Sequence, residues 1–141
     1  MKKVMVAGCF DLLHPGHLHF FKQARKHGDR LVVLLARDCN ILKTKNRAPF
    51  FSELERKEML EGLCVVDEVV LGNEEASRKY DKLLEIEPDA LVLGYDQHEM
   101  AGELKTFIER NKMQVKVIEL TESFEPERFK STVLRKCLDA K

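Results

Sequence analysis

The sequence predicts an α/β fold in which helices cover both faces of a five-stranded parallel sheet. Five short apolar runs lack the polar–apolar alternation of a half-exposed strand, so each suits a sheet that is buried on both faces. Helical segments separate these runs, and such strict alternation is typical of a doubly wound, Rossmann-like sheet. With 141 residues, the chain is expected to form a single domain over 1–141.

The expected strands lie at 4–7, 31–36, 69–71, 90–93 and 115–118. Glycine follows three of these runs, at Gly8, Gly72 and Gly94, and its low strand propensity explains why they stop there. In doubly wound sheets, ligands bind beyond the carboxyl ends of the strands. The residues that follow the strands are therefore expected to meet at one rim, at 8–11, 37–38, 72–73 and 94–96.

The expected helices lie at 16–27, 52–63, 76–86, 102–111 and 131–138. The first carries its apolar residues on or near one face and is ended by Gly28. The second begins with a capping box, because Glu55 follows Ser52 by three residues. Pro88 ends the third helix. The segment 38–51 has weak periodicity, so we expect a loop there.

Composition and charge exclude several classes of protein. Lys plus Arg and Asp plus Glu are equal at 24 each, which does not favour a nucleic-acid or membrane surface. No apolar run is long enough to cross a bilayer. Cys9, Cys39, Cys64 and Cys137 form no Cys-x-x-Cys pair, so we interpret them as reduced packing residues of a cytoplasmic protein.

The segment 8–17, GCFDLLHPGH, lies between the first strand and the first helix and carries the strongest chemical signal. Pro15 suits the first turn of a helix, and Gly16 lets a ligand approach the backbone closely. His14 and His17 are three apart, so on a helical turn they share a face. They would stand beside the free N–H groups and the positive end of the helix dipole. This arrangement predicts a site that donates hydrogen bonds to phosphate oxygens.

Other residues have two interpretations. The histidine pair could bind zinc, but the motif lacks the glutamate of His-Glu-x-x-His and no third ligand is evident. Basic residues alternate at Lys43, Lys45 and Arg47; such a cluster is usually a solvated patch, but the upstream histidines favour a loop that closes on phosphates. Phe50 and Phe51 are interpreted as loop anchors rather than as a flavin stack.

Gly-x-Phe-Asp followed by His-x-Gly-His resembles the hallmark of the cytidylyltransferase-like nucleotidyltransferase superfamily, over residues 4–134. Within it, archaeal FAD synthases are most similar, and they transfer AMP from ATP to FMN. The similar stretches are 36–38, 43–49, 55–59, 66–67, 71–72, 88–89 and 93–97. Cys9 replaces the usual threonine of the motif. The chain lacks the Arg and Gly that cytidylyltransferases carry before the last helix, and it has only Cys137 of the C-terminal cysteine pair frequent in archaeal FAD synthases.

The resemblance implies roles for individual residues. His14 and His17 would contact the triphosphate and stabilise the transition state. Asp11 would hold the motif loop or help to place the nucleotide and its magnesium. Lys45, supported by Lys43, would reach the phosphates from a mobile loop. The other residues implied in nucleotide binding are Gly8, Cys9, Phe10, Gly16, Asp38, Arg56 on the rim, Gly94 and Asp96 in the nucleoside pocket, and Ser131 and Thr132 at the start of the last helix.

The implied activity is transfer of a nucleoside monophosphate to a phosphorylated acceptor with release of pyrophosphate. ATP and FMN are the expected substrates, with Mg²⁺ carried on the triphosphate and a homodimer as the expected assembly. CTP with glycerol 3-phosphate, and ATP with a heptose phosphate, are the alternative pairs. A nucleotide-binding sensor without catalysis is the alternative from another class, and His14, His17 and Lys45 argue against it.

Overall fold

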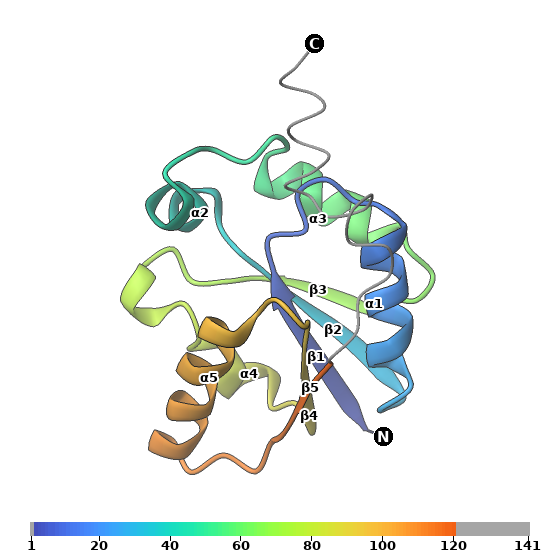
Figure 1. Cartoon of the computed structure of the whole chain (residues 1–141), viewed down its shortest axis with the longest axis vertical. Coiled ribbons are helices and arrows are strands. Elements are labelled where there is room, and N and C mark those ends of the chain that lie inside the picture. Colours follow the sequence, from blue (N-terminus) through green and yellow to red (C-terminus); the bar gives the residue numbers. More distant parts are fainter. Residues whose placement is uncertain (1, 121–141) are drawn as a thin grey trace.

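The computed structural model describes residues 2–120, and these contain one parallel sheet (Figure 1). The strand order is β3-β2-β1-β4-β5, so the expected fold class is confirmed. The strands are β1 (Lys3–Gly8), β2 (Arg30–Leu35), β3 (Glu68–Leu71), β4 (Ala90–Leu93) and β5 (Lys116–Glu119). The strand order reverses between β1 and β4, which makes the carboxyl ends of these two strands the topological switch point.

Helices lie on both sides of the sheet (Figure 1). They are α1 (Pro15–Arg25), α2 (Asp38–Lys45), α3 (Glu53–Glu61), α4 (Lys82–Ile86) and α5 (His98–Arg110), with a 3₁₀ turn η1 (Ala76–Arg78). Phe21 of α1 and Leu60 of α3 join the core on one face of the sheet. Leu83 of α4 and Leu104 of α5 join the core on the other face. Both faces are therefore buried, as the unbroken apolar strands predicted.

The expectation of a loop over 38–51 is wrong for its first half, where α2 lies. The helix buries only Asn40 and Ile41, so its sequence shows almost no helical period. Its beginning is held from outside: Glu53 Oε1 accepts from Asp38 N at 3.0 Å, and Asp38 Oδ2 accepts from Glu53 N at 3.1 Å. The helix ends at Asn46, whose φ of 58° is left-handed.

The expected helix at 76–86 is divided into η1 and α4, so that expectation also needs correction. Backbone bonds between residues three apart, from Asp81 N to Arg78 O and from Leu83 N to Tyr80 O, tighten the chain between the two pieces. By contrast, α5 is longer than expected and begins at His98 rather than near 102. The expected helix at 131–138, with Ser131 and Thr132, lies outside the described residues.

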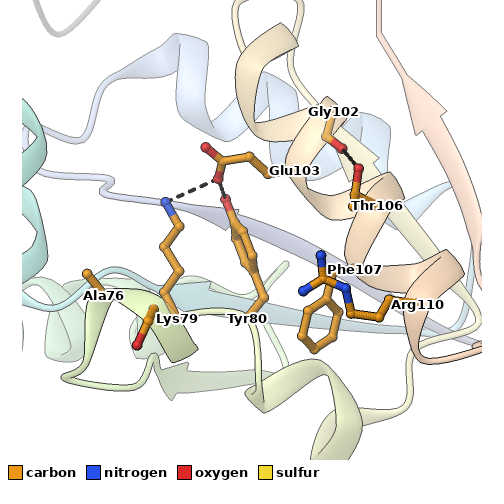
Figure 2. Close-up of a pocket in the computed structure, with 9 residues that line it drawn as sticks. Ala76, Lys79, Tyr80, Gly102, Glu103, Thr106, Phe107 and Arg110 are labelled. Atoms are coloured by element: carbon orange, nitrogen blue, oxygen red, sulfur yellow. Dashed lines mark hydrogen bonds and ion pairs between the residues drawn. The ribbon is translucent and has the colours of Figure 1, made fainter.

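A side-chain cluster joins the β3–β4 connection to α5 (Figure 2). Tyr80 Oη donates to Glu103 Oε2 at 2.5 Å, and Lys79 Nζ lies 3.1 Å from the same oxygen. The cluster borders an open hollow of about 410 Å³ between η1 and α5. The hollow shares no residue with the segment 8–17, so we assign this cluster to stability rather than to the chemistry.

Tyr80→Phe is expected to lower the free energy of unfolding by roughly 0.5–1 kcal/mol, the net value of one hydrogen bond. Burial, reinforced by the bond to Glu103, raises the pKa of Tyr80 well above its usual value. A raised pKa means that this contribution is complete below a pH of about 10 and is lost above it. Urea unfolding at neutral and alkaline pH checks this: the stability gap between wild type and Tyr80→Phe should narrow as the pH rises. A gap that is independent of pH would contradict the assignment.

Candidate active site

The ends of β1 and β4 are joined at the switch point by one side chain. Gln97 accepts from Gly94 N through Oε1 at 2.8 Å and donates to Ala7 O through Nε2 at 2.9 Å. Gln97 lies in a stretch that resembles archaeal FAD synthases, but no role was expected for it. Its position just after a buried strand was the available signal, together with an amide that can both donate and accept. This bridge fixes the rim from which the motif loop leaves the sheet.

The motif loop continues directly into α1. His14 is the N-cap residue, and its Nδ1 accepts from Gly16 N at 3.1 Å. Pro15 occupies the first helical position, as expected. Because Nδ1 acts as the acceptor, a neutral His14 carries its proton on Nε2. The ring is therefore set to donate a hydrogen bond from Nε2 at the beginning of the helix.

His14 and His17 lie against each other, as their spacing predicted. Their ring centroids are 3.8 Å apart with an interplanar angle of 30°. Burial lowers the pKa of both rings, and the charge of His14 adds to this effect for His17, whose pKa falls to about 3. His17 Nδ1 is buried and has no hydrogen-bond partner within residues 2–120. Two neutral imidazoles thus stand together, and one carries a polar atom that a ligand could satisfy.

Stability is expected to fall as the pH drops below about 6.5, the pKa of histidine in an unfolded chain. In the folded protein the pKa of His17 lies at about 3. The neutral His17 ring therefore contributes its full share of the folding stability above the unfolded-state pKa, and this share is lost as the pH falls toward the folded-state pKa. Chemical unfolding at several pH values between about 7 and 4 measures this loss. A His17→Asn variant should lose stability less steeply, and an equal slope in both proteins would contradict the assignment.

Phe10 packs against the histidine pair and carries backbone strain. Its φ of 46° is left-handed, which a bulky residue rarely adopts. Its ring is buried and packs edge-on against His17, with centroids 5.6 Å apart, and against Phe21 at 5.0 Å. A Cβ at Gly8 would lie 3.0 Å from the Phe10 ring, so a larger residue there would require the ring to shift. Gly8 and Phe10 therefore shape the loop in which the histidines stand.

Asp11 ties the motif loop to the connection between α2 and α3. Its Oδ2 accepts from Phe50 N at 2.6 Å and its Oδ1 accepts from Phe51 N at 2.8 Å, and the residue is buried. Of the two roles that the resemblance implied for Asp11, the structure shows the holding of the loop. The backbone of 50–51 is thus fixed to the motif loop, but the loop-anchor interpretation of the side chains does not fit Phe50, which is exposed, and stays a prediction for Phe51.

Arg56 is placed differently from the expectation that it faces the rim. Its side chain is 0% exposed, and its guanidinium donates to Phe51 O at 3.1 Å, to Cys9 O at 2.8 Å and to Asp38 Oδ1 at 2.6 Å. These bonds join the motif loop, the start of α2 and the start of α3. Arg56 and Asp38 thus hold protein segments together.

The basic cluster is exposed at the end of α2. Lys45 lies in the last turn of that helix rather than in a mobile loop, and Lys43 lies in the same turn. Neither lysine, nor Arg47, takes part in an ion pair within the described residues. At the β4 end of the rim, Gly94 is half-buried and Asp96 is exposed. The cluster is therefore a positively charged surface available to an anion.

No group of three His, Cys, Asp or Glu side chains within residues 2–120 could hold a metal ion. The described helices include none that is long and apolar enough to cross a membrane. The interpretation of the cysteines as packing residues is wrong for Cys39 and Cys64, which are exposed thiols. Cys9 is half-buried within the motif loop.

The fold and the histidine pair define a nucleotide-binding α/β protein, and the family comparison agrees. A family model described as cytidylyltransferase-like matches residues 5–137. The chain belongs to the cytidylyltransferase-like family, which confirms the predicted resemblance.

Among individual proteins, the chain is similar to FAD synthases. It is 42% identical over 120 residues to the FAD synthase of Methanohalophilus mahii, covering 85% of this chain and 82% of that protein. It is 38% identical to the FAD synthase of Thermococcus sibiricus, and the match covers 94% of this chain and 86% of that protein. A lipopolysaccharide core biosynthesis protein from Thermoplasma volcanium superposes with a TM-score of 0.79 at 36% identity, covering 89% of this chain and 99% of that one.

Proposed function

We propose that this protein is an FAD synthase, which transfers AMP from ATP to FMN and releases pyrophosphate. The stacked, neutral pair of His14 and His17 at the start of α1 carries the proposal for nucleotidyl transfer. The similarity of about 40% to FAD synthases over most of the chain supports ATP and FMN as the substrates.

In this reaction a phosphate oxygen of FMN attacks the α-phosphorus of ATP. The bond between that phosphorus and the oxygen bridging to the β-phosphate breaks, so FAD forms and pyrophosphate leaves. FMN is already ionised at neutral pH, so a general base is not required. The site therefore acts through positioning and charge stabilisation, as in other phosphoryl transfers.

The described residues suit this task. His14 is set to donate from Nε2 at the positive end of the α1 dipole, because its Nδ1 already accepts from Gly16 N. His17 has a buried nitrogen without a hydrogen-bond partner in the described residues. Gly94 and Asp96 stand on the rim as the proposed nucleoside contacts. Both oxygens of Asp11 already accept backbone N–H groups. We therefore place Mg²⁺ on the triphosphate, whose charge it would neutralise.

Lys45→Ala is expected to lower kcat by roughly tenfold or more while changing ATP affinity little, because its charge would act mainly in the transition state. Its position at the exposed end of α2, without an ion pair in the described chain, motivates this role. Steady-state kinetics and ATP binding are measured in parallel, with Lys26→Ala as the control for loss of an exposed lysine. Weakened ATP binding with unchanged kcat would contradict this role.

The substrate assignment is tested by pyrophosphate release with ATP or CTP against FMN, glycerol 3-phosphate and a heptose phosphate. FAD formation from ATP and FMN is the expected result. Formation of CDP-glycerol without FAD would reassign the substrates and leave the histidine mechanism in place. Nucleotide binding without release of pyrophosphate in any combination would favour the sensor. We further propose that the protein is a homodimer, which sedimentation analysis tests, and that it is cytoplasmic, which cell fractionation tests.

A further inference from the structure

We propose that the ring of Phe50 stacks on the planar ring system of the acceptor, the isoalloxazine of FMN. This inference rests on the proposed function and deepens it, because it names a residue that recognises the acceptor. Phe50 lies in the connection between α2 and α3, which contacts the motif loop directly.

The backbone at 50–51 is held firmly against the motif loop. The two oxygens of Asp11 accept from Phe50 N and Phe51 N at 2.6 and 2.8 Å. On the other side, Arg56 links Phe51 O to Cys9 O. Because Asp11 and Arg56 are both buried, these bonds are shielded from water. The position of Phe50 relative to the histidine loop is therefore well defined.

The ring of Phe50 is nevertheless exposed. It is 56% accessible, although aromatic side chains gain stability from burial. The Phe51 ring is half-buried and meets the Phe50 ring edge-on, with centroids 5.0 Å apart and an interplanar angle of 76°. The Phe50 ring is thus supported by its neighbour. An exposed aromatic ring on a rigid base beside an anion site suits a ligand that joins a planar ring to a phosphate.

The position of Phe50 favours the acceptor over adenine. Gly94 and Asp96, the proposed nucleoside contacts, follow β4, whereas Phe50 follows β2 and α2. In the sheet, β1 and its motif loop separate β2 from β4. The two contact regions are therefore approached from opposite sides of β1, and a stack on adenine would have to reach across the histidine loop. Glycerol 3-phosphate and heptose phosphates have no planar ring for Phe50 to contact.

The test measures KM for FMN and for ATP in Phe50→Ala, Phe50→Trp and the wild type, by FAD formation. Phe50→Ala is expected to raise the KM for FMN roughly tenfold and to leave the KM for ATP within about twofold, as loss of one aromatic stack would do. Phe50→Trp should keep the KM for FMN near the wild-type value, because Trp also offers an aromatic ring, and it should quench the fluorescence of bound FMN more than the wild type does. Leu84→Ala removes an exposed apolar side chain from α4, on the other face of the sheet, and should change neither KM.

FAD formation by the wild type tests the proposed function separately from the stack. Given that activity, an unchanged KM for FMN in Phe50→Ala would overturn the stacking role. An equal rise in both KM values would assign the ring to adenine or to loop shape, and a fall in kcat alone would make Phe50 a positioning residue. Either result overturns the proposal. Thermal unfolding confirms that each variant is folded.

Discussion

His17→Ala is expected to lower kcat by roughly a hundredfold or more, the effect of removing one donor to a developing charge. The residue is suited to this role because His17 stacks on His14 and has a buried nitrogen without a partner in the described chain. Burial holds the pKa of His17 at about 3, so at neutral pH the ring carries one N–H without a full positive charge. A neutral donor can strengthen its bond as charge grows on the phosphate.

The fold should survive His17→Ala, because the strand and helix cores of the sheet do not include this residue. Stopped assays of FAD formation measure kcat, and circular dichroism checks the fold. His27→Ala, which removes an exposed histidine just after α1, is the matched control and should retain wild-type kcat. Near-normal turnover of a folded His17→Ala protein would remove His17 from the mechanism.

Arg56→Leu is expected to lower the free energy of unfolding by about 3 kcal/mol and to abolish most activity. Removing the guanidinium leaves three acceptors without their shared donor: the carbonyls of Cys9 and Phe51 and the carboxylate of Asp38. Because Asp38 is partly exposed, water compensates some of the lost ion pair. The carbonyls of Cys9 and Phe51 are part-buried, so water replaces the lost donor only in part, and they belong to the segments that hold the histidine loop.

Urea unfolding measures this cost. Arg30→Leu is the matched control, because Arg30 pairs with Glu68 at the surface and should contribute less than about 1 kcal/mol. Arg56→Lys should be only partly tolerated, since one ammonium cannot span the three acceptors that the guanidinium reaches. If the Arg56→Leu protein were stable but bound ATP more weakly, this result would contradict the holding role and support the nucleotide contact that the resemblance implied for Arg56.

The elements predicted best are those whose signal is local. The unbroken apolar runs 31–36 and 90–93 predicted buried parallel strands, and β2 and β4 lie there within one residue. Ser52 and Glu55 form the predicted capping box at the start of α3, because a cap is made by neighbours in sequence. The histidine pair was predictable for the same reason, since a spacing of three places both rings on one turn.

Features that depend on distant partners could not be read from the sequence. Helix α2 has little amphipathic character, and its first turn is fixed by Glu53, fifteen residues away. Arg56 had the local features of a rim cation, but its guanidinium reaches a carbonyl in the motif loop 47 residues away. Burial and pairing depend on which segments meet in space, so tertiary structure alone decided that Arg56 holds the site together while the ring of Phe50 stays exposed.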